Sequence, residues 1–185
     1  MIFLSIYRFI RKHLLKIDDR TQLEIAIENG LKIGKNCHIM GECIIDPGHC
    51  WLIQIGNNVT LAPRVHILAH DASCKRSLNY TLVGRVTIGN NVFIGAGSII
   101  LPNVSIGDNV VIGAGSVVSH SIPANSVAVG VPARVLSRFE DYVNKRKRQM
   151  SVRPCYPKEY QIGNITAEKK EVMIKDLESG IGFVI

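Results

Sequence analysis

The stretch that decides the fold runs from Ile88 to Val118 and reads IGNNVFIGAGSIILPNVSIGDNVVIGAGSVV. A branched aliphatic residue recurs in it every six positions, at Ile88, Ile94, Ile100, Ile106, Ile112 and Val118. An α-helix repeats about every 3.6 residues and a strand about every two, so each group of six must be one unit stacked on others. Three groups form one turn, and residues 18 apart stack like neighbouring strands. We therefore predict an all-β parallel solenoid.

Corners of such a coil need backbone angles with positive φ, and Gly and Asn adopt these most easily. They occupy the positions between the aliphatic residues, as in Gly89-Asn90-Asn91 and Gly95-Ala96-Gly97. The same corner chemistry is therefore expected on every turn.

The six-residue phase is interrupted twice upstream. The inward positions are predicted to be Ile33, Ile39 and Ile45, then Ile55, Leu61 and Ile67, then Ile88. Extra residues thus lie between 45 and 55 and between 67 and 88, and insertions in a solenoid become loops that can carry chemistry. Polar and aromatic residues gather in both: Asp46, His49 and Trp51 in the first, His70, Asp71, Lys75 and Arg76 in the second.

The repeat is followed by Ile122–Arg134, which reads IPANSVAVGVPAR. With the repeat, this run resembles the hexapeptide-repeat acyltransferases, similar to the galactoside and maltose O-acetyltransferases and to those of polysaccharide gene clusters. The resemblance covers about 100 residues, from Ile33 to Arg134. It implies a left-handed β-helix, acetyl-CoA as co-substrate, direct transfer without a covalent enzyme intermediate, and a homotrimer whose groove between subunits holds the cofactor.

Three segments are expected: an N-terminal helical cap over 1–30, the β-helix acyltransferase domain over 31–134 with an inserted loop at 70–85, and a C-terminal helix and tail over 135–185. The length of 185 residues suits one domain with a cap at each end. An amphipathic helix is predicted from Val135 to Met150, and a second helix after Thr166 as N-cap. The tail is expected to pack back on the solenoid or on a neighbouring copy.

The resemblance puts the catalytic histidine at His70, within Ala69-His70-Asp71. The chemistry needs a base that works near neutral pH, and imidazole suits that task. Positions 45 and 67 are 22 apart, one turn of 18 plus four inserted residues, so Asp46 is expected near His70 as the carboxylate that orients it. Asp71 is the competing orienter. The alternative is that Asp46-Pro47-Gly48 is simply a turn.

For the cofactor, the resemblance implies Ala96 and Ala114 beside the pantetheine arm, with Ser119, His120 and Arg134 further along. The alternative for the alanines and the serine is a corner of the coil, which they would occupy with or without CoA. Ser119-His120 stands where relatives carry Thr-Lys.

Four residues are expected to contact the acceptor: His49, Trp51, Lys75 and Arg76. The preferred acceptor is a sugar hydroxyl of a surface polysaccharide or its precursor. Acetyl transfer to an amine of a nucleotide sugar or amino acid is the alternative within the same enzyme class. Two functions outside this enzyme class also stay open. One is a zinc hydro-lyase that uses His49, His66 and His70, and the other is a non-catalytic solenoid subunit. The acyltransferase interpretation expects no metal.

The chain carries 22 Lys and Arg against 15 Asp and Glu, a net charge of +7, with a dense patch at Lys145–Arg148. That patch is either a solvated helix face or a surface that attracts a phosphate-bearing cofactor or an acidic glycan. Aromatic residues make up only 6%, and no nucleic-acid-binding motif accompanies the charge, so no nucleic acid partner is expected.

The apolar segment Met1–Ile10, followed by Arg11 and Lys12, is too short to span a bilayer. It either caps the solenoid or lies on a membrane surface as a basic amphipathic helix. The five cysteines form no CxxC motif, which favours reduced thiols and a cytoplasmic location. Membrane association through Met1–Ile10 is the alternative to its role as a cap.

Overall fold

The structure is a computed structural model that describes residues 21–185. The chain divides into two compact units, residues 1–137 and 138–185. Length alone suggested a single domain, but the 48 C-terminal residues make their own strand pair and helices. The predicted N-terminal segment Met1–Ile10, whether cap or membrane helix, lies outside the described residues.

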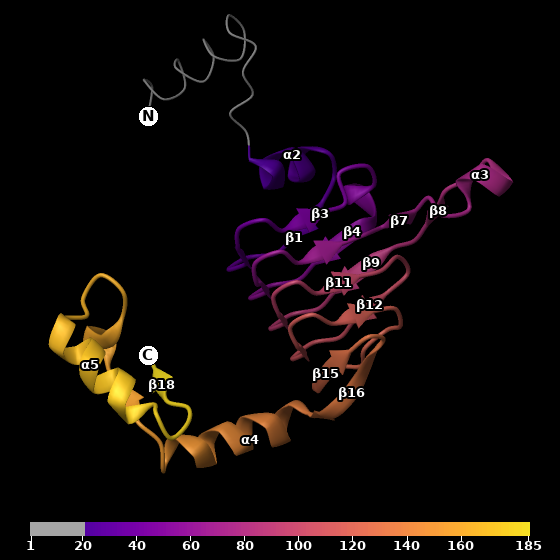
Figure 1. The fold of residues 1–185 in the computed structure, drawn as a ribbon. Coiled ribbons are helices and arrows are strands. Elements are labelled where there is room, and N and C mark those ends of the chain that lie inside the picture. The colour runs from indigo at the N-terminus through magenta and orange to yellow at the C-terminus, as the bar shows by residue number, and fades with distance from the viewer. Residues whose placement is uncertain (1–20) are drawn as a thin grey trace, which may run out of the picture. The chain divides into compact units, whose positions relative to one another are not determined.

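The first unit is built from three sheets that the chain visits in turn (Figure 1). The first sheet contains β1 (Lys32–Ile33), β4 (Ile53–Ile55), β9 (Val86–Ile88) and β12 (Ser105–Ile106). The second contains β2 (His38–Ile39), β5 (Thr60–Leu61), β10 (Phe93–Ile94), β13 (Val111–Ile112), β15 (Ser126–Gly130) and β16 (Ala133–Arg138). The third contains β3 (Ile44–Ile45), β6 (His66–Ile67), β11 (Ile99–Ile100) and β14 (Val117–Val118). We call one strand from each sheet, taken in sequence order, a turn of the coil.

The strand register confirms the predicted six-residue period. Ile94 pairs with Ile112 and Ile100 with Val118, in each case 18 residues on, and the strands are parallel. Upstream, Ile45 pairs with Ile67, 22 residues on, and Ile67 with Ile100, 33 residues on. The excess over 18 is therefore four residues at the first interruption and 15 at the second.

The paired aliphatic residues fill the interior of the coil, where Leu61, Ile67, Ile94, Ile100, Ile112 and Val118 are fully buried. At one corner, asparagines with φ between 53° and 55° stack as Asn58, Asn91 and Asn109. Each side-chain amide donates to the next carbonyl oxygen, at 3.0 and 3.1 Å. This ladder satisfies polar groups at a corner whose left-handed backbone Asn tolerates.

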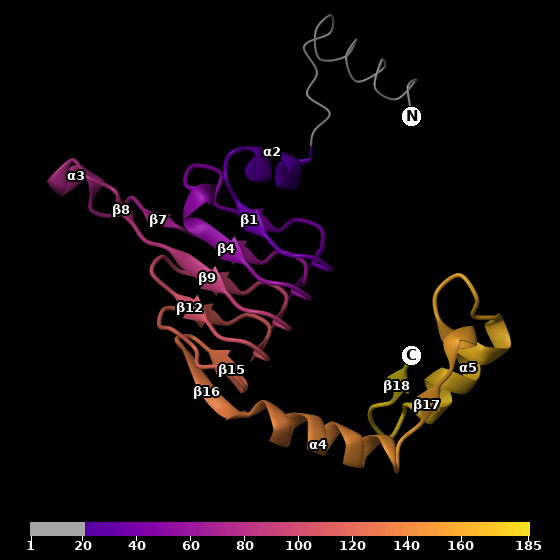
Figure 2. The ribbon, with the colours of Figure 1, turned by 180° about the vertical axis from the view of Figure 1, so that it is seen from behind.

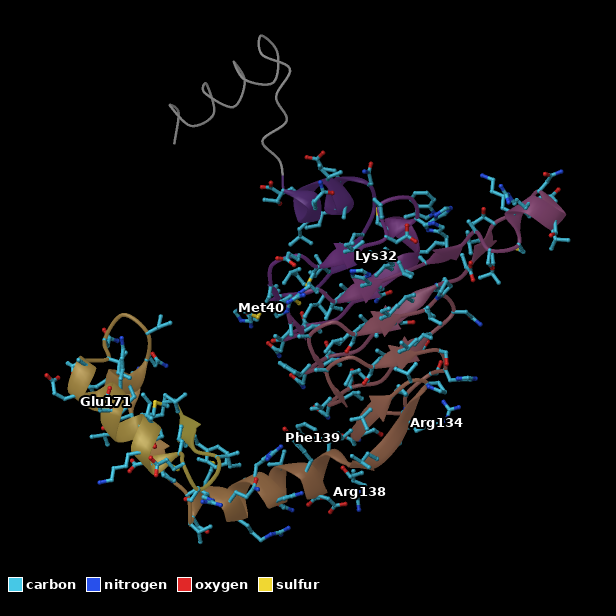
Figure 3. All side chains as sticks on the ribbon, viewed as in Figure 1. Lys32, Met40, Arg134, Arg138, Phe139 and Glu171 are labelled. Atoms are coloured by element: carbon cyan, nitrogen blue, oxygen red, sulfur yellow. The ribbon has the colours of Figure 1, made fainter. Side chains whose placement is uncertain are left out.

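The two ends of the coil differ. Helix α2 (Gln22–Glu28) begins at a capping box between Thr21 and Glu24, buries Ala26, and lies by the first turn (Figure 1). Lys32 and Met40 belong to that turn, whereas Arg134 lies on β16 at the opposite end (Figure 3). None of the helices within residues 21–185 is long and apolar enough to cross a membrane.

The second insertion is an arm rather than an irregular loop. It comprises β7 (His70–Asp71), the short helix α3 (Lys75–Leu78) and β8 (Leu82–Val83), and its two strands pair antiparallel. Figure 2 shows the arm projecting from the side of the coil, with α3 at its free end. We call residues 70–83 the arm.

The second unit contains α4 (Phe139–Met150), β17 (Cys155–Tyr156), the 3-10 helix η2 (Lys158–Tyr160), α5 (Ala167–Asp176) and β18 (Phe183–Val184). Thr166 caps α5 as predicted. The predicted start of α4 at Val135 was four residues early, because residues up to Arg138 continue β16 in extended conformation. The tail pairs through β18 with β17, within its own unit.

Candidate active site

Asp46 is the buried charge at the centre of the site. Its backbone N–H donates to the carbonyl of Ile67 at 2.9 Å, which continues the pairing of β3 with β6. The four inserted residues then turn the chain away through the 3-10 helix η1 (Cys50–Leu52). The Asp46 side chain is left with no exposed surface. A buried carboxylate is costly unless it is fully hydrogen-bonded, so its partners decide whether it can stay ionised.

Four donors reach this carboxylate. Oδ1 accepts the backbone N–H groups of Gly48 at 2.9 Å and His49 at 3.1 Å, whereas Oδ2 accepts the N–H of Ala69 at 2.8 Å and Nδ1 of His70 at 2.5 Å. Asp46 therefore has both roles considered from the sequence. Oδ1 stabilises the turn at Gly48 and His49, and Oδ2 orients His70.

The electrostatics agree with an ionised Asp46. Burial alone raises the pKa of the carboxyl, but the hydrogen bonds from His70 and from the backbone of Ala69 and Gly48 outweigh it. The pKa is thus held below its ordinary value of 3.8. A carboxylate at this position favours the His70 tautomer that carries its proton on Nδ1.

His70 is the first residue of the arm, where the chain leaves the third sheet. Its side chain is 35% exposed, while Nδ1 points to Asp46. With the proton on Nδ1, the other ring nitrogen, Nε2, carries a lone pair and can accept a proton. This is the arrangement of a general base.

Two further rings lie beside His70. The His49 ring is 5.0 Å from that of His70 and 5.2 Å from that of Trp51, measured between centroids. Nδ1 of His49 is buried, has no hydrogen-bond partner among the described residues, and lies 4.0 Å from Oδ1 of Asp46. Sequence reasoning proposed His49 and Trp51 as acceptor contacts, but it missed that both histidines face one carboxylate. Only the folding of the four-residue insertion brings them together.

Asp71 differs from Asp46 in every respect that matters for orienting His70. Its Oδ1 accepts the N–H of Ser73 at 2.8 Å, and that hydrogen bond lowers its pKa. The side chain is exposed, and as the next residue of an extended strand it faces the opposite side from His70. The geometry therefore favours Asp46.

Lys75 and Arg76 are not brought to His70 within this chain. Both belong to α3, at the free end of the arm (Figure 1). Neither residue is therefore placed beside the Asp46–His70 pair of the same chain.

The residues expected at the cofactor fall into two groups. Ala96 and Ala114 stack at the corner between the second and third sheets, where the N–H of Gly115 donates to the carbonyl of Ala96 at 2.9 Å. Both alanines are exposed, and an added Cβ at Gly97 or Gly115 would meet open space. These stacked alanines and glycines form a column at the corner that exposes its backbone to solvent.

The second group follows the third sheet on the last turn. Oγ of Ser119 lies 2.9 Å from Nδ1 of His120. His120 and Arg134 both line a small pocket, together with Ile122 and Ala133. The guanidinium of Arg134 donates to the carbonyl of Ala133 at 2.9 Å, which holds the cation at this edge.

The same site has the composition of a metal site. One ligand atom each from Asp46, His49 and His70 lies within 4.8 Å of the others. His66, the third ligand of the zinc alternative, is not part of this group and sits on β6. Both oxygens of Asp46 already accept two hydrogen bonds each, so a metal there would have to displace one of those donors.

Comparison with known proteins gives the family. Residues 85–120 match the family described as bacterial transferase hexapeptide (six repeats). Protein CapG of Staphylococcus aureus is 39% identical to the chain over 142 residues, which are 74% of the chain and 83% of CapG. The chain belongs to the hexapeptide-repeat transferase family. As a member of it, the protein is an acyltransferase.

Two other relatives of this hexapeptide-repeat transferase are informative. The galactoside O-acetyltransferase of Escherichia coli (strain K12) is 41% identical over 120 residues, which are 61% of the chain and 56% of that enzyme. A hexapeptide-repeat-containing acetyltransferase from Vibrio cholerae O1 biovar eltor, solved with acetyl coenzyme A, is 27% identical with a TM-score of 0.54. That match covers 60% of the chain and 61% of the Vibrio protein. The chain therefore spans little more than half of these two relatives.

Proposed function

We propose that this protein is an acetyl-CoA-dependent O-acetyltransferase with His70 as general base and a sugar hydroxyl, in a surface polysaccharide or its precursor, as acceptor. The observation that carries the proposal is the hydrogen bond of 2.5 Å between Nδ1 of His70 and the fully buried Asp46. A coil that served only as a spacer would have no use for a buried ionised carboxylate aimed at a half-exposed imidazole.

In the proposed reaction, Nε2 of His70 takes the proton of the acceptor hydroxyl while that oxygen attacks the thioester carbonyl. Asp46 holds the ring in the correct tautomer and stabilises the imidazolium that forms. When the tetrahedral intermediate collapses, the carbon–sulfur bond breaks and the imidazolium returns its proton to the departing thiolate. The products are the acetyl ester and free CoA, so no other reactant is needed.

The proposed cofactor site lies between two copies of the chain. Ala96 and Ala114 belong to the corner between the second and third sheets, whereas His70, Ser119 and His120 follow the third sheet. One chain thus distributes these residues over two different corners. A groove in which one copy supplies the alanines and the next supplies the histidines unites them, and a closed ring of three copies gives three equal grooves.

Relatives support these finer points. The Vibrio neighbour was solved with acetyl coenzyme A, which supports the donor, and the Escherichia coli relative is named for galactosides, which supports a sugar acceptor. The left-handed sense of the coil is proposed on the same likeness to hexapeptide-repeat acetyltransferases.

His70→Ala tests the proposal. It should reduce turnover by about 10²- to 10⁴-fold, the usual contribution of a general base. Acetyl-CoA affinity, followed by calorimetric titration, should stay nearly unchanged because the imidazole is not part of the proposed cofactor contacts. His38→Ala is the matched control, since His38 lies exposed on β2 and should keep full turnover. A loss of less than tenfold for His70→Ala would remove His70 from the mechanism.

A further inference from the structure

His49 carries an unusual nitrogen that the proposed chemistry does not use. Its Nδ1 is buried without a hydrogen-bond partner among the described residues, yet it lies 4.0 Å from Oδ1 of Asp46. That distance is too long for a hydrogen bond. The side chain as a whole is 30% exposed, so the rest of the ring reaches the surface of the site.

The neighbouring carboxylate determines which His49 nitrogen holds the proton. Oδ1 of Asp46 already accepts two backbone N–H groups, from Gly48 and from His49 itself. An unprotonated Nδ1 would direct a lone pair at a negative oxygen, whereas a protonated Nδ1 is attracted to it. This contact favours the His49 tautomer that carries its proton on Nδ1, the same tautomer that Asp46 favours in His70, and in that tautomer Nε2 is a hydrogen-bond acceptor.

The two imidazoles form a pair of acceptors. Both direct Nδ1 toward Asp46, and in an imidazole ring this leaves Nε2 on the side away from the carboxylate. Their ring centroids are 5.0 Å apart with planes tilted by 42°, and both side chains are about one-third exposed. The ring of Trp51, a residue that is 54% exposed, lies 5.2 Å from that of His49 between centroids. The site therefore offers two adjacent lone pairs beside an exposed aromatic face.

We propose that His49 is a specificity-determining residue that selects acceptors with two neighbouring hydroxyls, a vicinal diol on a sugar ring. This proposal rests on the proposed function. Nε2 of His70 takes the proton of the reacting hydroxyl, Nε2 of His49 accepts a hydrogen bond from the hydroxyl next to it, and Trp51 packs on the apolar face of the sugar. An acceptor with a lone hydroxyl leaves Nε2 of His49 without its donor.

The test uses the full chain, acetyl-CoA, methyl galactopyranoside and the 2-, 3-, 4- and 6-deoxy derivatives of that sugar. One derivative should not react, because it lacks the acetylated hydroxyl. A second derivative, which lacks the hydroxyl next to the acetylated one, should show kcat/KM roughly tenfold lower than the parent sugar. This factor is the contribution of one hydrogen bond. His49→Phe keeps an aromatic ring but removes the acceptor nitrogen, so it should lower kcat/KM for the parent sugar to the level of that second derivative. His49→Gln, which offers a carbonyl oxygen, should restore part of the preference.

His38→Phe is the matched control, since His38 lies exposed on β2 and should leave the tenfold preference intact. A wild-type enzyme that acetylates the parent and the second derivative equally well would overturn this inference and leave the proposed function standing. Transfer to none of the sugars would overturn both. Nitrogen-15 spectra of the histidines give an independent readout: a protonated Nε2 on His49, or shifts of both histidines with Zn²⁺ but not with the sugar, would also overturn the inference.

Discussion

The replacement of Asp46 by asparagine tests the site most sharply, because it changes charge and hydrogen bonding while keeping shape. The asparagine amide has one acceptor oxygen and one donating NH₂ group, and four donors surround this side chain. An NH₂ on the Oδ1 side would face two backbone N–H groups. On the Oδ2 side it would face the N–H of Ala69 and the ring of His70, which can change tautomer. The second orientation is therefore favoured.

The two expected effects of Asp46→Asn can be separated. The N–H of Ala69 loses its acceptor, which costs about 1–3 kcal/mol for a buried donor. For a chain of this size each 1 kcal/mol lowers Tm by about 2–4 °C, so a fall of about 2–12 °C is expected. His70 accepts from the amide through Nδ1 and carries its proton on Nε2, the wrong tautomer for a base. Turnover should then fall by about 10²- to 10⁴-fold, with acetyl-CoA affinity nearly unchanged.

Steady-state rates with the best sugar acceptor, calorimetric binding of acetyl-CoA and thermal unfolding measure these effects. The matched control is Asp71→Asn, because Asp71 is exposed and its hydrogen bonds come from Ser73. It should change turnover by less than tenfold. If Asp46→Asn lowered Tm as expected but kept turnover within tenfold of wild type, Asp46 would be a structural turn residue and would not orient His70.

Three further outcomes are expected. Stability should depend on Asp46 ionisation: because its pKa is held below 3.8 in the folded state, its stabilising contribution is present above that value and is lost as pH falls through the lowered pKa. The Tm difference between wild type and Asp46→Asn should therefore shrink between pH 7 and pH 3, and a constant difference would contradict the argument. Ala114→Trp should abolish binding of acetyl-CoA in calorimetry, because a large side chain fills the exposed column, while Tm stays near that of wild type; normal binding would place the cofactor elsewhere. Ile112→Ala should lower the free energy of unfolding by about 2–5 kcal/mol in urea titration, since Ile112 is fully buried between paired turns, and a loss below about 1 kcal/mol would argue against a tightly packed coil.

The sequence predicted the coil well because its repeat encodes register directly. A shift of one residue would turn every inward aliphatic residue outward, so Ile94 and Ile112 can pair only as they do. The same arithmetic, applied to the spacing between Ile45 and Ile67, predicted that Asp46 lies near His70. Regular periodicity is a strong signal, and the proximity of Asp46 to His70 followed from it, whereas the catalytic role of His70 was implied by the family resemblance.

Where periodicity ended, the sequence was less informative. The insertion after Ile67 predicted a loop, but it forms a paired arm that carries Lys75 and Arg76 away from His70. The helix expected from Val135 begins only at Phe139, because the pairing of β16 with β15 keeps the preceding residues extended. In both cases backbone hydrogen bonding to a neighbouring strand outweighed local secondary-structure propensity. Such pairing cannot be predicted from the residue types of the segment alone.

The buried charge explains why the site sits at an interruption of the coil. Within the regular repeat the inward positions are mostly aliphatic, with the buried serines Ser98 and Ser116 among them, and the corner carboxylate of Asp108 is exposed. Among the described residues, Asp46 is the carboxylate that is both buried and surrounded by donors, and it lies where the repeat is interrupted. Four extra residues after Ile45 supply the N–H groups of Gly48 and His49, and the departure of the arm after Ile67 supplies those of Ala69 and His70. Two insertions on neighbouring turns thus each supply two of the four donors that hold Asp46.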